Sequence, residues 1–192
     1  MNLEQTSAPS VEPVTTADQK SWMRVDASDE DTLIGSLAAA ARSYFEMSTR
    51  RQLITATWVY KITDFPSGEI VLPISPVQSV THIKYYDNDD SLQTWSASNY
   101  VLDKSSTPAR IRPAANKDYP SDTRGEPYDI AITFVAGYGD AASDCPDGAL
   151  TAIKLLAANW FENRESNAPI TLTPVPMALD ALMLQFWDGT VT

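Results

Sequence analysis

The stretch from Asp129 to Glu165 constrains the fold most, because it switches from strand periodicity to helix periodicity across one short turn. Ile130, Ile132 and Phe134 alternate with smaller residues, which is the two-residue repeat of a strand. Gly137 lies where this repeat stops, and glycine allows backbone angles that other residues avoid. The segment therefore predicts a strand, a tight turn and a following helix.

The helix of this segment is predicted to cover residues 146–165. Pro146 suits a first helical turn, because its missing N–H has no intrahelical partner to lose there. Apolar residues then recur every three or four positions and form one wide stripe. The stripe consists of Leu150, Ile153, Ala157, Trp160 and Phe161.

A second strong helical pattern covers residues 29–51. Ser28 and Asp31 resemble a capping box, with Asp in place of the usual Glu or Gln. The apolar face of this helix consists of Leu33, Ile34, Leu37, Ala41, Tyr44 and Phe45. The alanine run from Ala38 to Ala41 permits close packing of another helix, so we expect the two long helices to pack face to face. The predicted helical core is Leu37, Ala41, Ile153, Ala157, Trp160 and Phe161.

The chain ends hold weaker patterns. Residues 1–14 contain two prolines and few large apolar residues, which predicts an extended arm that is ordered only if a partner holds it. Thr15 or Thr16 can then cap a short helix, with Trp22 as an apolar contact near its end. A proline-rich linker covers residues 166–176. Pro176 is expected to begin a last helix.

Between the helices, residues 53–138 change to a period of two. The alternation predicts about seven strands, because such spacing places one face of each strand in a core. Asp87 to Asp90 separate two of them and are typical of a turn, since Asp and Asn side chains bond their own backbone. Residues 113–127 hold three prolines and one glycine and are expected to form a surface loop.

The order of these elements predicts an α+β fold, in which a small helical bundle carries an inserted antiparallel β subdomain. The expected parts are an arm at 1–14, a helical body at 15–52 and 139–187, a β insertion at 53–138 and a tail at 188–192. A chain of 192 residues is long enough for one domain with such an insertion.

Composition excludes several function classes. The formal net charge is −11, which argues against binding nucleic acid by charge neutralisation and against docking on anionic membranes. Cys145 is the single cysteine, so no disulfide can form within the chain. The first residues lack a basic start and an apolar run, so we expect no signal peptide.

Residues that could carry chemistry are few. His82 is the single histidine and lies in a strand pattern, where a structural role is favoured. Cys145 lies before a helix start that could stabilise a thiolate, but no local signature supports a nucleophile. The acids at Asp87–Asp90 do not follow the spacing of a calcium loop, which needs a later glycine and glutamate. We therefore expect no metal, no cofactor and no enzyme activity. A hydrolase that uses unmarked carboxylates is the weakest alternative.

Several short segments, taken in order, resemble one protein family. They are the RVD run at Arg24–Asp26, VLPISPVQSV at 71–80, ARIRPA at 109–114, FVAGYGD at 134–140 and WFENRE at 160–165. Their order and spacing resemble the head–tail connector (adaptor) proteins of tailed double-stranded DNA phages. The resemblance covers roughly residues 15–187.

The resemblance implies a structural virion protein in the neck of a phage particle, assembled in the host cytoplasm. It implies a homo-oligomeric ring, usually twelve-fold, beneath the portal protein and above a stopper or tail protein, through which packaged DNA passes without sequence-specific binding. Acidity suits such a channel, because repulsion keeps DNA sliding. The alternative from the residues is a β-rich carbohydrate- or receptor-binding virion module, based on Trp58, Tyr85, Tyr86 and Trp95.

The C-terminal end is the candidate portal contact. In the resembling family this segment reaches the portal, and an aromatic pair beside a short polar tail is a plausible anchor. The residues are Phe186, Trp187, Asp188, Gly189, Thr190, Val191 and Thr192. The competing interpretation is that the two aromatic side chains cover the core of the chain itself.

Overall fold

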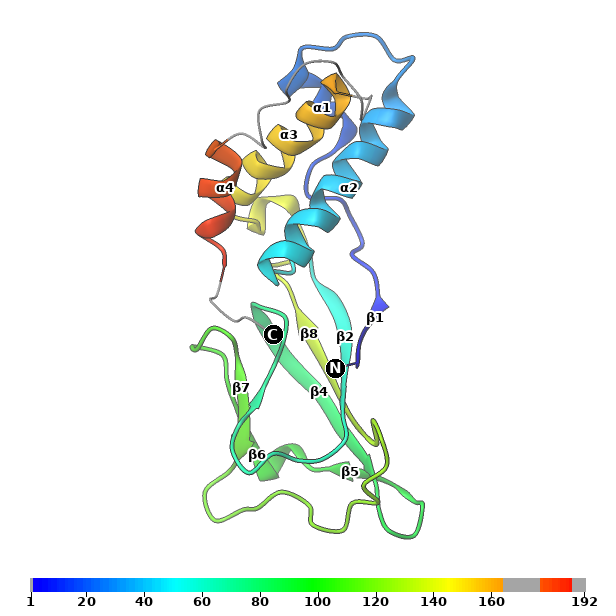
Figure 1. Ribbon diagram of the computed structural model, residues 1–192, viewed down its shortest axis with the longest axis vertical. Helices are drawn as coiled ribbons and strands as arrows, with labels where there is room; N and C mark the ends of the chain where they lie inside the picture. The colour runs from blue at the N-terminus through cyan, green and yellow to red at the C-terminus, as the bar shows by residue number, and fades with distance from the viewer. Residues whose placement is uncertain (1, 164–176, 188–192) are drawn as a thin grey trace. The chain divides into compact units, whose positions relative to one another are not determined.

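The computed structural model describes residues 2–163 and 177–187 and has an α+β fold, as the sequence predicts (Figure 1). The chain divides into two compact units. The β unit is formed by residues 1–10 and 55–138, and the helical unit by residues 11–54 and 139–192. The predicted linker at 166–176, the start of the last helix at Pro176 and the tail at 188–192 lie outside the described residues.

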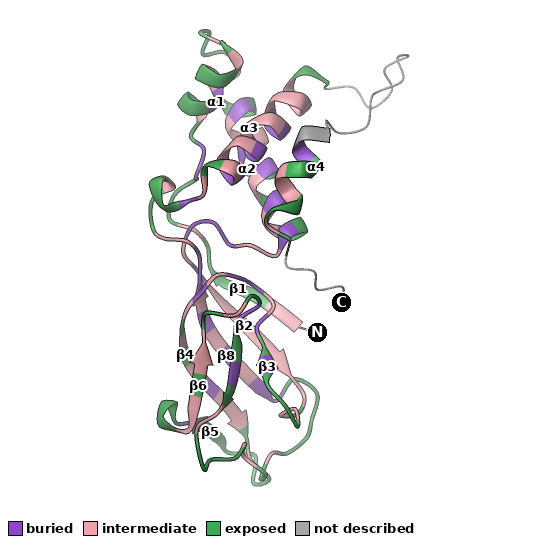
Figure 2. Cartoon of the chain, turned by 90° about the vertical axis from the view of Figure 1, so that its left-hand side faces the viewer, coloured by how far each residue is buried: buried purple, intermediate pink, exposed green. Residues whose placement is uncertain are grey.

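The larger sheet of the β unit has five antiparallel strands in the order β1-β2-β8-β4-β5. The strands are β1 (Asn2–Ser7), β2 (Ala56–Ile62), β8 (Ile130–Ala136), β4 (Val77–Tyr86) and β5 (Leu92–Trp95). Along β8, every second residue from Ile130 to Ala136 is buried, so the two-residue repeat seen in the sequence faces the core (Figure 2).

A second sheet of three short antiparallel strands completes this unit. It has the order β3-β7-β6, with β3 at Ile70–Val71, β7 at Arg110–Pro113 and β6 at Tyr100–Asp103. A short 3₁₀ turn at Ala97–Asn99 precedes β6. Ile70 and Ile111 from this sheet share one buried cluster with Ile83 and Ile132 of the larger sheet. The β unit therefore has a single apolar core.

The N-terminal segment is a strand of this core structure. β1 pairs antiparallel with β2, with Leu3 opposite Tyr60 and Gln5 opposite Trp58. The expectation that residues 1–14 are ordered only by a separate partner is wrong, because β2 of the same chain supplies the hydrogen bonds. Residues further along this segment belong to the helical unit, where Pro13 and Val14 are buried.

The described residues of the helical unit form four helices. They are α1 (Thr16–Met23), α2 (Asp31–Thr49), α3 (Asp147–Glu162) and α4 (Met177–Leu184), with a 3₁₀ turn at Ala142–Asp144 before α3. α2 packs against α3, and α1 and α4 pack against both. Small residues at the contact, among them Ala38, Ala41 and Ala157, are buried and allow the helices to approach closely.

One local expectation about the helices needs correction. Ser28 does not form a capping box with Asp31: the N-cap is Glu30 without a side-chain cap, and Asp31 instead pairs with Lys20 at 2.6 Å. Trp22, expected to make an apolar contact near the end of α1, is 46% exposed. The buried residue of α1 is Gln19, whose Nε2 donates to the carbonyl oxygen of Lys154 on α3 at 3.1 Å.

Candidate functional site: surfaces rather than a catalytic centre

Cys145 is not placed for nucleophilic chemistry. Its side chain is buried, and burial together with the nearby carboxylates of Asp144 and Glu46 raises the pKa of the thiol to about 11. A thiol with this pKa is protonated at neutral pH, and the thiolate is the reactive form. Cys145 is therefore a small core residue ahead of α3.

His82 has a structural partner on the neighbouring strand. Its Nε2 lies 3.0 Å from Oγ1 of Thr133 on β8. Partial burial, with Lys84 nearby, lowers the pKa of the ring, so the neutral form is favoured. The described residues contain no group of three or more His, Cys, Asp or Glu side chains that could hold a metal ion.

The acidic run between β4 and β5 is a hairpin turn, as the sequence predicts. Oδ1 of Asp87 accepts hydrogen bonds from the N–H groups of Asp89 at 3.0 Å and Ser91 at 2.9 Å. Oδ2 accepts from Nε2 of Gln93 at 2.7 Å. These bonds, of which that from the Ser91 N–H has the largest effect, lower the pKa of Asp87 and hold the turn in place.

Arg124 ties the long loop before β8 to this hairpin. Its guanidinium donates to Asp129 and Asp90, and it lies over the ring of Tyr86 with 4.9 Å to the ring centre. The hydrogen bond from Arg124 lowers the pKa of the buried Asp129 carboxyl. This contact cannot be predicted from the sequence, because no spacing rule links an arginine in a loop to a distant turn.

The aromatic residues proposed for sugar binding do not form an exposed platform. Trp95 is buried and packs against the rings of Phe65, Tyr100 and Tyr119, at distances of 5.1 to 5.6 Å between ring centres. The cluster consists of Phe65, Tyr85, Trp95, Tyr100 and Tyr119. Tyr86 lies beneath Arg124, and Trp58 is half-buried. The carbohydrate-binding alternative therefore loses the observation that motivated it.

The predicted helical core residues fall into two groups. Ala41, Ile153 and Ala157 are buried. Leu37, Trp160 and Phe161 are half-buried, and the ring of Trp160 meets that of exposed Tyr44 edge-on, with 6.2 Å between centres. The expectation of a fully buried Trp160 is therefore wrong, because its ring lies at the margin of the helix contact.

The aromatic pair at the C-terminal end has two different environments. Phe186 meets the buried Phe45 edge-on at 5.3 Å between ring centres, and its carbonyl oxygen accepts from Nε of Arg51 at 2.9 Å. Phe186 therefore fastens α4 to α2 within the chain. Trp187 is 49% exposed. The remaining candidate portal residues, 188–192, lie outside the described residues.

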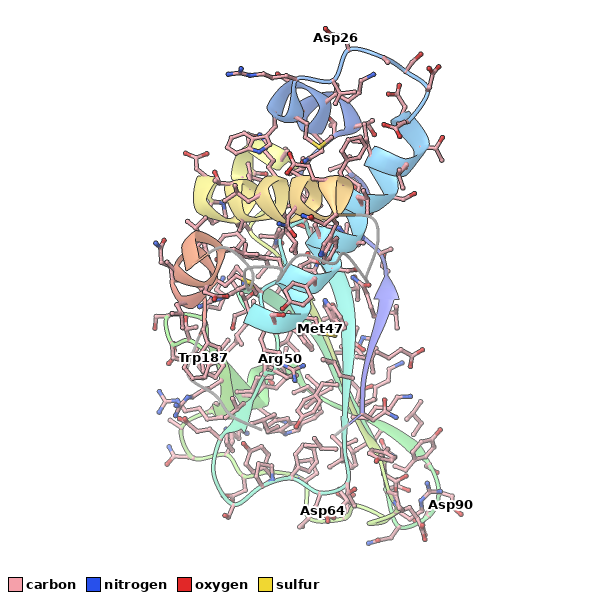
Figure 3. All side chains as sticks on the ribbon, turned by 45° about the horizontal axis from the view of Figure 1, so that its top comes forward. Asp26, Met47, Arg50, Asp64, Asp90 and Trp187 are labelled. Carbon is pink, nitrogen blue, oxygen red and sulfur yellow. The ribbon has the colours of Figure 1, made fainter. Side chains whose placement is uncertain are left out.

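A groove of about 380 Å³ lies between α2 and α4 beside Trp187. Figure 3 shows Trp187 just after α4, and Met47 and Arg50 near the end of α2. The residues that line the groove are Tyr44, Ser48, Thr49, Asp180, Met183, Leu184 and Trp187. Among the described residues that line it, Asp180 alone belongs to a type that is charged at neutral pH, so the groove suits a largely uncharged segment.

A buried ion pair fixes the end of α2 that borders this groove. Arg42 donates to Glu46, one helical turn away, at 2.6 Å and to Glu12 at 2.7 Å. Burial lowers the pKa of Arg42, but the two carboxylates outweigh it and the net shift is upward. Burial raises the pKa of Glu46, although the N–H of Leu53 and the Arg42 guanidinium act against this shift.

No helix among residues 2–163 and 177–187 is long and apolar enough to cross a membrane. No protein-family model matches the chain. A search of curated proteins finds no match.

Solved structures contain chains with the same fold. One is in the neck of an empty gene transfer agent (GTA) particle computed with C6 symmetry, with 26% identity and a TM-score of 0.82. Another is in the neck of a native GTA particle computed with C12 symmetry, with 25% identity and a TM-score of 0.79. A third, in the virion of the native particle, has 24% identity and a TM-score of 0.83 and supports the fold alone.

Each of these matches covers 100% of this chain and 98% of the other chain. The likeness therefore includes the helical unit and the β unit together, rather than one common motif. The resemblance to the head–tail connector family is thereby confirmed, and the chain has the fold of a structural protein from the neck of phage-like particles.

Proposed function

We propose that this chain is a head–tail adaptor that forms a twelve-fold ring beneath the portal, joins the capsid to the tail and lines the DNA exit channel. The observation that supports it most is the whole-chain likeness, at 26% identity and a TM-score of 0.82, to a chain in a particle neck. A related neck was computed with C12 symmetry, which supports the number of copies.

The geometry of the chain is consistent with a structural role rather than a catalytic one. The thiol of Cys145 is buried and has a raised pKa, and His82 lies within hydrogen-bond distance of Thr133. The carboxylate of Asp87 accepts hydrogen bonds from the backbone of its own turn. What the molecule offers to partners is surface, in particular the groove between α2 and α4 and the exposed Trp187 beside it.

The portal contact in this proposal is made by Trp187 and residues 188–192. Phe186 contributes indirectly, because its packing on Phe45 seats α4 and thereby fixes where the C-terminal segment begins. An exposed tryptophan is among the side chains that contribute most to binding when a partner buries it. The ring below the adaptor, a stopper or tail protein, contacts other surfaces.

The charge of the chain suits a channel for DNA. Twelve copies with a formal charge of −11 each would carry about −132 in total. A wall of this sign repels phosphate groups, so packaged DNA would slide rather than adhere. Assembly of such a ring takes place in the host cytoplasm before or during joining of head and tail.

An electron-microscopy map of the intact neck tests this proposal. The expected result is one ring of twelve copies of this chain between the portal and the next component, with DNA density along its axis. A map in which the chain lies on the outer surface of the particle or at the tail tip would contradict it, and would favour a receptor-binding role instead.

A further inference from the structure

The solvent-facing side of α2 carries no charge, which is unusual for a surface helix in a chain this acidic. The exposed positions after its first residue are Thr32, Leu33, Ser36, Ala40, Ser43, Tyr44, Met47 and Ser48. A surface helix normally places charged residues on the side opposite its core face. Over more than four turns, α2 places none there.

The charged residues that α2 does contain are directed into pairs. The side chains of Arg42 and Glu46 are 15% and 13% exposed and bind each other, with Glu12 as a second partner of Arg42. Asp31, at the first turn, pairs with Lys20 of α1. The helix therefore contains charged residues, but none of them lies on its outer face.

The same outer face has an apolar stripe in coiled-coil spacing. Leu33, Leu37, Ala40, Tyr44 and Met47 follow one another at intervals of four, three, four and three residues. This spacing keeps residues on one side of a helix and is typical of a seam against another helix. Met47, the most exposed of the large side chains in the stripe at 69%, lies near the C-terminal end of α2 (Figure 3).

The stripe is distinct from the face of α2 that packs within the chain. The buried positions are Ile34, Ala38, Ala41, Phe45 and Thr49, which are rotated around the helix from the stripe. The stripe extends onto neighbouring helices, because Tyr44 meets Trp160 of α3 and borders the groove with Leu184 and Trp187. Tyr44 therefore links the stripe to Trp160 of α3 and to the groove beside α4.

We infer that the outer face of α2, from Leu33 to Met47, is the contact through which one copy of this chain binds the next copy. This inference rests on the proposed ring and specifies which surface closes it. In a ring, the contact is head-to-tail, so the stripe meets a different surface of the neighbouring copy.

A second copy fits this surface better than a charged partner does. Each copy has a formal charge of −11, so the net electrostatic interaction between two copies is repulsive. An uncharged apolar face is where such molecules can approach with the least repulsion. DNA is excluded as the occupant, because the face presents no Lys or Arg to phosphate groups.

Photo-cross-linking in assembled particles tests the inference. A photoreactive benzoylphenylalanine replaces Met47 in one variant and Leu92, which is exposed in the β unit, in a control variant. After irradiation, the expected product at Met47 has twice the mass of the chain and contains two copies of it by mass spectrometry. A product that joins Met47 to the portal or to a tail protein would overturn the inference but leave the neck assignment intact.

A product that joins Met47 to residues 164–176 of the same chain would also overturn it, because that segment would then be the occupant. Failure to find the chain in the neck at all would contradict the proposed function first, so the two failures are distinguishable.

A charge substitution gives an independent measurement. Met47→Lys should leave the monomer folded, since the side chain is exposed, and should lower incorporation into the neck by about tenfold or more. Leu92→Lys, a matched change on the β unit, should have little effect. Normal incorporation of Met47→Lys would contradict the inference. Should the variant not fold, the cross-linking result decides.

Discussion

At the level of single residues, the start of α1 is held by a capping box between Thr15 and Asp18. The backbone N–H of Asp18 donates to Oγ1 of Thr15, and both the N–H and the hydroxyl of Thr15 donate to the Asp18 carboxylate, at distances of 2.6 to 3.1 Å. The hydrogen bonds from Thr15 lower the pKa of Asp18 below its ordinary value of 3.8. The sequence predicts a cap at Thr15 or Thr16, because each hydroxyl precedes a helical pattern, and the structure places it at Thr15.

Thr15→Ala should lower the free energy of unfolding by about 1 kcal/mol, the usual contribution of such a cap. Because the pKa of Asp18 is lower in the folded chain, its stabilisation is complete above pH 3.8 and is lost as the pH falls through the folded value. The difference between the variant and the natural chain should therefore narrow in strongly acidic solution. Urea unfolding at neutral pH and at about pH 3 measures both effects, and Thr15→Ser is the control that keeps the hydroxyl.

At the level of helices and strands, the contact between α2 and α3 has a buried centre, which includes Ile153, and a half-buried margin, which includes Trp160. Ile153→Ala should lower the free energy of unfolding by about 2–5 kcal/mol, because it leaves a cavity in the helical core. Trp160→Ala should cost less, about 1–2 kcal/mol, since its ring is half-buried against Tyr44. Denaturant unfolding of both variants tests this order. A larger loss for Trp160→Ala would show that the ring carries more of the contact than its burial indicates.

Local chemistry explains which elements the sequence predicts well. β4 and β5 lie on either side of Asp87–Asp90, as expected, because alternation and an Asp-rich turn act over a few neighbouring positions. β1 was not predicted as a strand, because Asn2–Ser7 has no alternation and gains its hydrogen bonds from β2, more than fifty residues away. The burial of a side chain depends in the same way on residues that are distant in the sequence. For this reason the sequence pattern predicts a greater burial of Trp160 than the structure has.

The residues of the candidate surfaces could be named from the sequence, but their positions relative to the core could not. The sequence grouped Phe186 and Trp187 as one apolar end. In the structure they differ, because Phe186 is half-buried against Phe45 and its carbonyl oxygen accepts from Arg51, whereas Trp187 is exposed. The sequence pattern of α2 did not separate its uncharged outer face from its core face, because apolar residues occur on both. Leu33 and Tyr44 were assigned to one face with Ile34 and Phe45, and the structure shows that they belong to another.

At the level of the whole molecule, the C-terminal segment can be tested without disturbing the fold. Truncation after Trp187 keeps α4 and the contact of Phe186 with Phe45, so the chain should remain folded. The proposed portal contact predicts that DNA-filled heads then accumulate without tails, which electron microscopy of the particles can count. If the truncated chain still joins heads to tails normally, residues 188–192 do not bind the portal.

The position of β1 has a practical consequence for anyone who expresses part of this chain. A fragment of residues 53–138 contains the other strands of the β unit but lacks β1, which covers one side of β2. In that fragment, the backbone N–H and C=O groups of β2 that β1 normally binds would face water. Such an open edge recruits strands from other molecules, so the fragment would be prone to aggregation, and a peptide of residues 2–7 added in excess would compete for the edge.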